Sequence, residues 1–445
     1  MFFPNFFLHC LLGSTRYRAL GIVARLAVCM PLLLAGCGGG GGSNTNSAVI
    51  GASIPGDNVI PLTVDSGPAG AGPQANRLYT SVTLCQPGTS TSNCQIIDHV
   101  LVDTGSIGLR LIASQVSSAL NLQATTSPVT VACQQFLDNS FAWGPVVSAD
   151  IKLGGKTISN LPIQIMGDAA HQASSSTCAI GTAITSVIDI GLLRGLGATG
   201  ILGVGTSKED CGVGCAGNPN NGYYFTCSGA SCSGKRLPLA SQLQNPVYAL
   251  SADNNGVKVV LPGLPSGTNS ASSMTGSMVF GIGTQANNAT TGASAMRLTY
   301  NPSYGYVVNT AVSSAPYSAT MANSFLDTGS NGLYFGTLAS LPLPVCSTAP
   351  DFYCPLSTTF FSAELTGSTG STRAISFAVD PATGGASALF NSSDPVLPTL
   401  AGPSGDASQF IWGLPFFYGR TVFIGFEGRS GVFNGTAVAG PYYAF

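Results

Sequence analysis

The chain has 445 residues, of which only 8% are charged, whereas an average soluble domain has roughly 25%. It contains 57 glycines, its hydrophobic fraction is 44%, and its formal net charge is −2. This composition excludes a coiled coil or other long-helix protein, charge-rich disorder, and a nucleic-acid binder that works through a basic patch. Glycine, proline and β-branched residues between turn signals predict a mostly-β protein.

The first 36 residues have the pattern of an export signal. Arg16, Arg18 and Arg25 are followed by an apolar stretch over 26–34, and the sequence Leu-Ala-Gly-Cys ends at Cys37. A basic start, a short apolar segment and small residues before a cut are typical of a secretory signal. The last four residues resemble a bacterial lipobox, so we expect Cys37 to be lipidated. The alternative is an ordinary signal peptide with an incidental cysteine.

Residues 37–74 are rich in Gly, Ser and Pro and are predicted to form a flexible tether behind the lipid. The residue after Cys37 is Gly38 rather than Asp, which weakly favours the outer membrane of a two-membrane bacterium. No later stretch reaches the roughly 20 apolar residues of a membrane span. We therefore expect an exported protein that is anchored to the bacterial envelope through its N-terminal lipid.

The ten cysteines after Cys37 predict up to five disulfides, because an exported chain matures in an oxidising compartment. The close pairs Cys85/Cys94 and Cys346/Cys354 are typical of loop staples. Four other closely spaced cysteines could instead form a zinc site, although export favours disulfides and we expect no metal. These four are Cys211, Cys215, Cys227 and Cys232.

Two stretches of the chain share the pattern Asp-Thr-Gly-Ser-x-Gly-Leu. One begins at Asp103 and the other at Asp327, and each lies between two apolar runs. One match could be chance in a chain so rich in Gly and Ser, whereas two in the same frame imply two related lobes. Each is followed downstream by an apolar-apolar-Gly segment, at residues 200–205 and 410–413.

These motifs resemble those of the pepsin-like aspartic peptidases. In that family each of two lobes contributes Asp-Thr-Gly-Ser/Thr and a later apolar-apolar-Gly that crosses beneath it. The resemblance covers about residues 75–435, and the chain also resembles an uncharacterised family of bacterial lipoproteins with paired Asp-Thr-Gly-Ser motifs. It implies a mostly-β, bilobal pepsin-like acid protease fold of two pseudo-symmetric β-barrel lobes, residues 75–262 and 263–445.

The resemblance implies that Asp103 and Asp327 hydrolyse peptide bonds with a water activated between them. Two carboxylates about 3 Å apart cannot both ionise comfortably, so they share one proton. The ionised member acts as general base while the protonated member polarises the scissile carbonyl, and the titration belongs to the pair. For each Asp alone, capping of a tight turn is the alternative.

The neighbours of the two acids are expected to position the carboxylates. The glycines permit the tight turn, the threonines would cross-bond the two loops, and the serines would hydrogen-bond the outer carboxylate oxygens. These supporting residues are Thr104, Gly105, Ser106, Thr328, Gly329 and Ser330.

By the same resemblance, a hairpin over about residues 133–155 should cover the acids. Family members normally carry a Tyr there, and this stretch has none. Phe141 or Trp143 is the expected cover, with packing between lobes as the alternative for Trp143. Arg110, where many members have Trp, is expected to be an exposed strand residue, or else to pair with an acid near the cleft.

Other chemistries fit the sequence less well. A serine hydrolase needs a His, and after Cys37 the chain has only His99 and His171, with no Gly-x-Ser-x-Gly elbow. Residues 195–200 match Gly-x-Gly-x-x-Gly, but no βαβ context surrounds them, so we expect no cofactor. We expect a monomer that takes a protein or peptide substrate and no nucleic acid. The main rival is a catalytically inactive surface lipoprotein that binds a peptide or partner.

Overall fold

The computed structural model describes residues 49–51, 53–89, 92–171, 178, 188–228, 231–336, 343–381 and 393–445. The predicted signal segment, the predicted lipidation site Cys37 and the first part of the predicted tether lie outside these ranges. Within them no helix is long and apolar enough to cross a membrane.

The largest sheet brings together the start, middle and end of the chain. Among the described residues it contains 18 strands, and β2 pairs with β15 while β14 pairs with β27. In chain order its strands are β1 (Val49–Gly51), β2 (Val59–Val64), β3 (Leu78–Cys85), β4 (Cys94–Asp103), β5 (Ile107–Ile112), β6 (Gln123–Ala124), β7 (Thr130–Gln135), β8 (Ser140–Leu153), β9 (Lys156–Met166), β10 (Ile188–Asp189), β11 (Gly200–Val204), β12 (Tyr224–Ser228), β13 (Ser231–Gly234), β14 (Gly256–Leu261), β15 (Ser273–Phe280), β16 (Ala295–Arg297), β27 (Arg420–Gly425) and β30 (Tyr442–Ala444).

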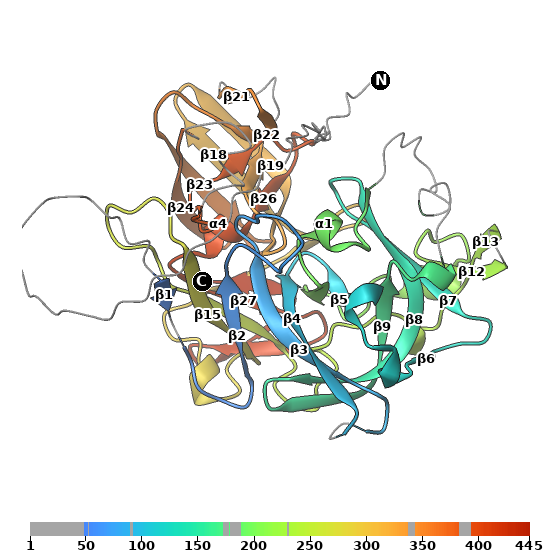
Figure 1. Cartoon of the computed structure of the whole chain (residues 1–445). Coiled ribbons are helices and arrows are strands. Elements are labelled where there is room, and N and C mark those ends of the chain that lie inside the picture. The colour runs from blue at the N-terminus through green and yellow to red at the C-terminus, as the bar shows by residue number, and fades with distance from the viewer. Residues whose placement is uncertain are drawn as a thin grey trace, which may run out of the picture. The chain divides into compact units, whose positions relative to one another are not determined.

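A second sheet is built wholly from the later part of the chain, and its strands β18, β19, β23 and β24 are labelled together in Figure 1. Its strands are β17 (Thr299–Asn301), β18 (Gly305–Ser314), β19 (Tyr317–Leu326), β20 (Leu333–Phe335), β23 (Thr359–Thr366), β24 (Thr372–Val379), β25 (Ala401–Gly402) and β26 (Phe410–Trp412). Two small hairpins are β21 (Val345–Cys346) with β22 (Ala349–Tyr353), and β28 (Ser430–Phe433) with β29 (Thr436–Ala439).

The helices of the described ranges are single turns between strands. The α-helices are α1 (Leu193–Leu196), α2 (Val213–Gly217) and α4 (Leu414–Phe417). The 3₁₀ turns are Ala113–Gln115, Ser118–Leu120, Ala169–His171, Leu239–Ser241 and Ala286–Asn288.

The structure differs from the sequence prediction at β2, which lies inside the predicted tether. Ile60, Leu62 and Val64 are buried, and the strand pairs with both β15 and β3. Alternate apolar residues on one face are the pattern of a half-buried strand. The prediction of a flexible tether through residue 74 is therefore wrong for this segment, which belongs to the core.

Each predicted Asp loop is built the same way. Asp103 ends β4, the chain turns into β5, and the later strand β11 runs parallel to β4 and antiparallel to β5. Asp327 directly follows β19, the chain turns into β20, and β26 runs parallel to β19 and antiparallel to β20. The two apolar-apolar-Gly segments thus lie beside their Asp strands, as the resemblance implied. The predicted mostly-β fold class is confirmed, while the lobe boundary at residue 262 stays a prediction.

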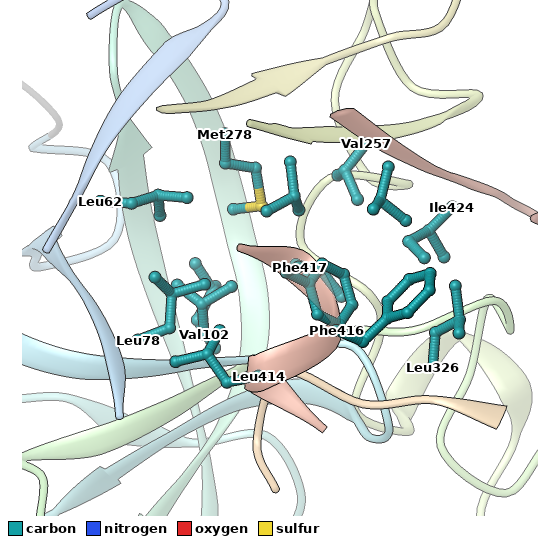
Figure 2. Close-up of a cluster of buried hydrophobic side chains, with 14 of the residues drawn as sticks. Leu62, Leu78, Val102, Val257, Met278, Leu326, Leu414, Phe416, Phe417 and Ile424 are labelled. Atoms are coloured by element: carbon teal, nitrogen blue, oxygen red, sulfur yellow. The ribbon is translucent and has the colours of Figure 1, made fainter. Parts of the chain in front are cut away.

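One buried apolar cluster lies directly behind both Asp loops. It includes Val102 and Leu326, each of which immediately precedes one of the acids, together with Leu414 and Phe417 of α4. Figure 2 shows these side chains grouped with Leu62, Met278 and other residues of the large sheet. Because protein interiors are close-packed, this cluster fixes where each Asp loop begins.

The ten cysteines among the described residues form five disulfides, the number expected from the sequence. The group that could have bound zinc instead forms two short loop staples. The pairs are Cys85–Cys94, Cys133–Cys178, Cys211–Cys215, Cys227–Cys232 and Cys346–Cys354.

Candidate active site

The two acids of the repeated motif have matching hydrogen-bond donors. The backbone N–H of Gly105 donates to Asp103 Oδ1 at 2.7 Å, and that of Gly329 donates to Asp327 Oδ1 at 2.9 Å. The serine that follows each glycine donates to the Oδ2 atom of the same acid, at 2.6 Å in the second loop. These donors hold both carboxylates in fixed orientations.

The two loops are tied to each other by their threonines. The backbone N–H of Thr104 donates to Thr328 Oγ1 at 3.1 Å, and the backbone N–H of Thr328 donates to Thr104 Oγ1 at 3.1 Å. Each hydroxyl also donates to the residue that precedes the acid of the other loop. The Thr104 hydroxyl donates to Leu326 O at 3.0 Å, and the Thr328 hydroxyl donates to Val102 O at 2.7 Å. Both threonine side chains are buried, so these four bonds fix the separation of the loops.

The backbone of each loop touches the carboxylate of the other. A Cβ atom at Gly105 would lie 2.8 Å from Asp327 Oδ1, and a Cβ atom at Gly329 would lie 2.8 Å from Asp103 Oδ1. Any larger residue would push the opposite carboxylate away. The two glycines are therefore required by the close approach of the acids.

The two carboxylates interact strongly. Burial, and next the neighbouring Asp103 carboxylate, raise the pKa of Asp327 to about 8. The donors from Ser330 and Gly329 act in the opposite direction. Asp103 is buried, with 6% of its surface exposed, whereas Asp327 is half-buried. A pair of this kind retains one proton across the acid and neutral range, so it offers both a base and an acid to a bound molecule.

The hairpin that was expected to cover the acids is present, but its two aromatic side chains pack in a separate cluster. β7 pairs with β8, and the tip lies at 136–139. Phe141 and Trp143 are buried in a separate apolar cluster, where Trp143 packs against Phe225. These contacts give both rings a packing role in place of the expected cover.

Leu137 is the apolar side chain that the hairpin tip presents to solvent, with 62% of its surface exposed. In the sequence, an apolar residue directly before the polar pair Asp138 and Asn139 of a turn is the signal that could have found it.

Arg110 is buried, with 1% of its surface exposed, so the expectation of an exposed strand residue is wrong. It forms the expected alternative, an ion pair, with its Nη2 at 3.3 Å from Asp210 Oδ2. The guanidinium also donates to Ile107 O and to Gln134 Oε1, so it joins the strand after the first Asp loop to β7 of the hairpin. Asp210 also accepts a bond from Tyr224, and burial raises its pKa to about 6.

Two residues beside the second loop carried no signal in the sequence. Arg77 Nη1 donates to the carbonyl of Gly329 at 3.1 Å. Tyr334 donates to Asn331 Oδ1, and burial raises its pKa. Arg77 lies far from the motif in the chain, so only the fold could place it there.

Among the residues that the structure describes, no group of three or more His, Cys, Asp or Glu residues could hold a metal ion. His99 and His171, the two histidines after Cys37, each contact a neighbouring aspartate instead. The candidate chemistry is therefore that of the carboxylate pair and its hydrogen-bond donors.

Comparison with known proteins places the chain in a family without naming an activity. No curated protein matches it. The crystal structure of the aspartic proteinase from Irpex lacteus is similar over 82% of this chain and 92% of that chain, with a TM-score of 0.42 and 16% sequence identity. The model of the family described as "Protein of unknown function (DUF3443)" matches residues 55–445, and the chain therefore belongs to this family.

Proposed function

We propose that the protein is an aspartic-type endopeptidase whose catalytic pair is Asp103 and Asp327. The observation that carries this proposal is the pair itself: a buried and a half-buried acid in matched loops, each loop bonded to the other through its threonine. Structural turn-capping would not require two acids to lie against each other. Close like charges raise the free energy of the doubly ionised state, and active sites are where such arrangements concentrate.

The pair could perform hydrolysis without a covalent intermediate. The ionised carboxylate takes a proton from water while the water oxygen bonds to the carbonyl carbon of the peptide. The protonated carboxyl gives its proton to the carbonyl oxygen, which forms a gem-diol. The C–N bond then breaks as the nitrogen receives a proton from the pair, one diol proton returns, and a carboxylic acid and an amine leave. The pair ends with the single proton with which it began.

One observation favours the rival function, a binding module without turnover. The aromatics Phe141 and Trp143, which were expected to cover the pair, pack in a separate cluster. A less complete cover would admit more water and weaken the electrostatic effect of the site. The two Asp loops and the bonds between them are nevertheless complete, so we give the peptidase precedence.

We further propose that the protein works outside the cytoplasm as a lipid-anchored monomer. This part rests on the sequence of the export signal and on the lipobox at Cys37. Its five disulfides fit an oxidising compartment. The substrate would then be a protein or peptide of the bacterial envelope or its surroundings.

The test is cleavage of an unfolded protein by the purified chain between about pH 3 and pH 7, with products mapped by mass spectrometry. We expect internal cleavage that is blocked by a hydroxyl-containing mimic of the gem-diol. Asp98→Asn, a change on the exposed part of β4, should cleave at the wild-type rate. If the folded protein binds the mimic or the substrate and never cleaves, the binding module replaces the peptidase.

A further inference from the structure

A cavity in the later half of the chain includes neither acid of the pair. Its volume is about 200 Å³, and it lies among β24, β26, α4 and the start of β27, elements that Figure 1 labels. Its wall is partly polar and partly apolar: Phe377, Trp412 and Phe416 supply aromatic surface, and Arg420 is the charged residue in it.

Arg420 is a half-buried cation without a carboxylate partner. Its Nη1 donates to the carbonyl of Phe416 at 2.6 Å, and the guanidinium lies over the Phe416 ring at 4.8 Å. No carboxylate whose side chain the structure describes forms an ion pair with it. The stretches 337–342 and 382–392, which lie outside the description, contain no Asp or Glu.

The positive charge of the Arg420 guanidinium is therefore not balanced by a carboxylate of the described residues. Removal from water disfavours a cation, and burial lowers the pKa of Arg420 accordingly. A guanidinium has five N–H donors, and the hydrogen bonds that Arg420 makes to the described residues use only its Nη1 group. The remaining donors suit the planar, two-oxygen geometry of a carboxylate.

We propose that this cavity binds a carboxylate with an apolar, preferably aromatic, body, with the carboxylate on Arg420 and the body against Phe377 and Trp412. The size of the cavity fits such a ligand. An apolar protein cavity of about 150 Å³ accepts benzene, so about 200 Å³ accommodates a phenyl ring with a short chain. A small aromatic acid and the C-terminal residue of an apolar peptide share this chemistry.

The probes are 3-phenylpropionate, its uncharged analogue 3-phenylpropanol, and the tripeptide Ala-Ala-Phe with a free or an amidated C-terminus. Binding to the full chain is measured by titration calorimetry. The chain has two tryptophans, and Trp412 lines the cavity, so its fluorescence should change on binding. We expect the free acids to bind about 10- to 100-fold more tightly than their uncharged analogues, as loss of a hydrogen bond to a charged group implies. Tighter binding of the tripeptide acid would identify a peptide C-terminus as the source, and binding of 3-phenylpropionate alone would identify a small acid.

Three variants distinguish the effect of the Arg420 charge on binding from the effect of the cavity volume. Arg420→Gln should bind the acid and the alcohol equally weakly. Ala378→Leu fills part of the cavity and leaves the charge, so it should weaken both ligands. Arg373→Gln removes a charge from the same strand outside the cavity and should bind like the wild type. The proposal is overturned if the folded wild type binds neither acid, or if it prefers neither acid over its uncharged analogue. If Arg420→Gln fails to fold, the comparison of each acid with its uncharged analogue on the wild type, together with Ala378→Leu, still tests the proposal. None of these measurements depends on peptidase activity.

Discussion

Thr104 and Thr328 exchange hydrogen bonds across the candidate site, each accepting on its Oγ1 from the other's backbone N–H at 3.1 Å. Each residue directly follows an acid of the pair, so the exchange sets how far apart the carboxylates lie. The repeat in the sequence thus produces a symmetric clamp, because the two copies of the loop face each other and form the same bonds in both directions.

The clamp should show strong coupling between its two halves. Thr104→Val and Thr328→Val each keep the side-chain shape but leave buried partners without a bond, which should lower the free energy of unfolding by about 1–3 kcal/mol. The double variant should lose less than the sum, because all four bonds hold the same contact between the loops, and loss of one half weakens the other half. Urea unfolding of the four proteins measures this, with Thr320→Val on the exposed face of β19 as control. Strict additivity would show that the loops are held independently.

The close approach of the acids makes Gly105 irreplaceable. In Gly105→Ala the new methyl group would lie 2.8 Å from Asp327 Oδ1, so the carboxylate must move. We expect a loss of about 1–3 kcal/mol in the free energy of unfolding, as for other overpacked sites, and loss of cleavage. Gly405→Ala, where a Cβ meets no atom within 4 Å, is the matched control. Equal stability and activity of both variants would mean that the two loops lie farther apart than described.

The raised pKa of Asp327 makes stability depend on pH in a defined direction. The folded protein keeps this proton up to about pH 8, while an unfolded Asp loses it near pH 3.9. Between these values the folded state binds more protons at this site, so the contribution of Asp327 to the free energy of unfolding falls as pH rises.

Asp327→Asn removes this titration, so the free energy of unfolding of the variant should decline less with rising pH than that of the wild type. Since Asp327 is partly exposed, we expect a difference of about 1–3 kcal/mol between pH 4 and pH 8. The pKa of Asp210 is raised in both proteins, so its contribution cancels in the comparison. Urea unfolding across this range is the measurement, and identical pH profiles for the two proteins would contradict the coupling of the pair.

The buried ion pair between Arg110 and Asp210 should behave as a unit. Arg110→Leu leaves a buried carboxylate without its cation and should lower the free energy of unfolding by about 3–5 kcal/mol. Adding Asp210→Asn should recover part of this loss, because Asn keeps a bond to Tyr224 without the charge. Arg373→Gln on β24 serves as the surface control. A double variant as unstable as the sum of its parts would show that the two residues act separately.

Much of the site could be predicted because its residues are adjacent in the sequence. Asp103, Thr104 and Gly105 lie within one loop, and the second copy of the loop repeats them in frame. A tight turn between apolar strands is a local property, so its pattern survives in the sequence. The disulfides could be expected for a similar reason, because four of the five pairs close short loops.

The remainder depends on contacts between distant parts of the chain. Arg110 is buried because Asp210 and Gln134 lie beside it, and no local pattern shows that. The position of Phe141 and Trp143 in the hairpin predicts that they cover the acids. Both instead pack in a cluster with Phe225 and a disulfide, which are distant in the sequence. At β2 the alternating Ile60, Leu62 and Val64 did give a local signal, which the surrounding Gly, Ser and Pro obscured.

The central claim is that Asp103 and Asp327 act as one hydrolytic unit, and the most direct test is the cleavage rate of three variants. Asp103→Asn, Asp327→Asn and the double variant should each lower kcat/KM by about 10²–10⁴, and the double should lose no more than either single. Circular dichroism checks that each variant is folded. Wild-type cleavage by either folded single variant would contradict the account.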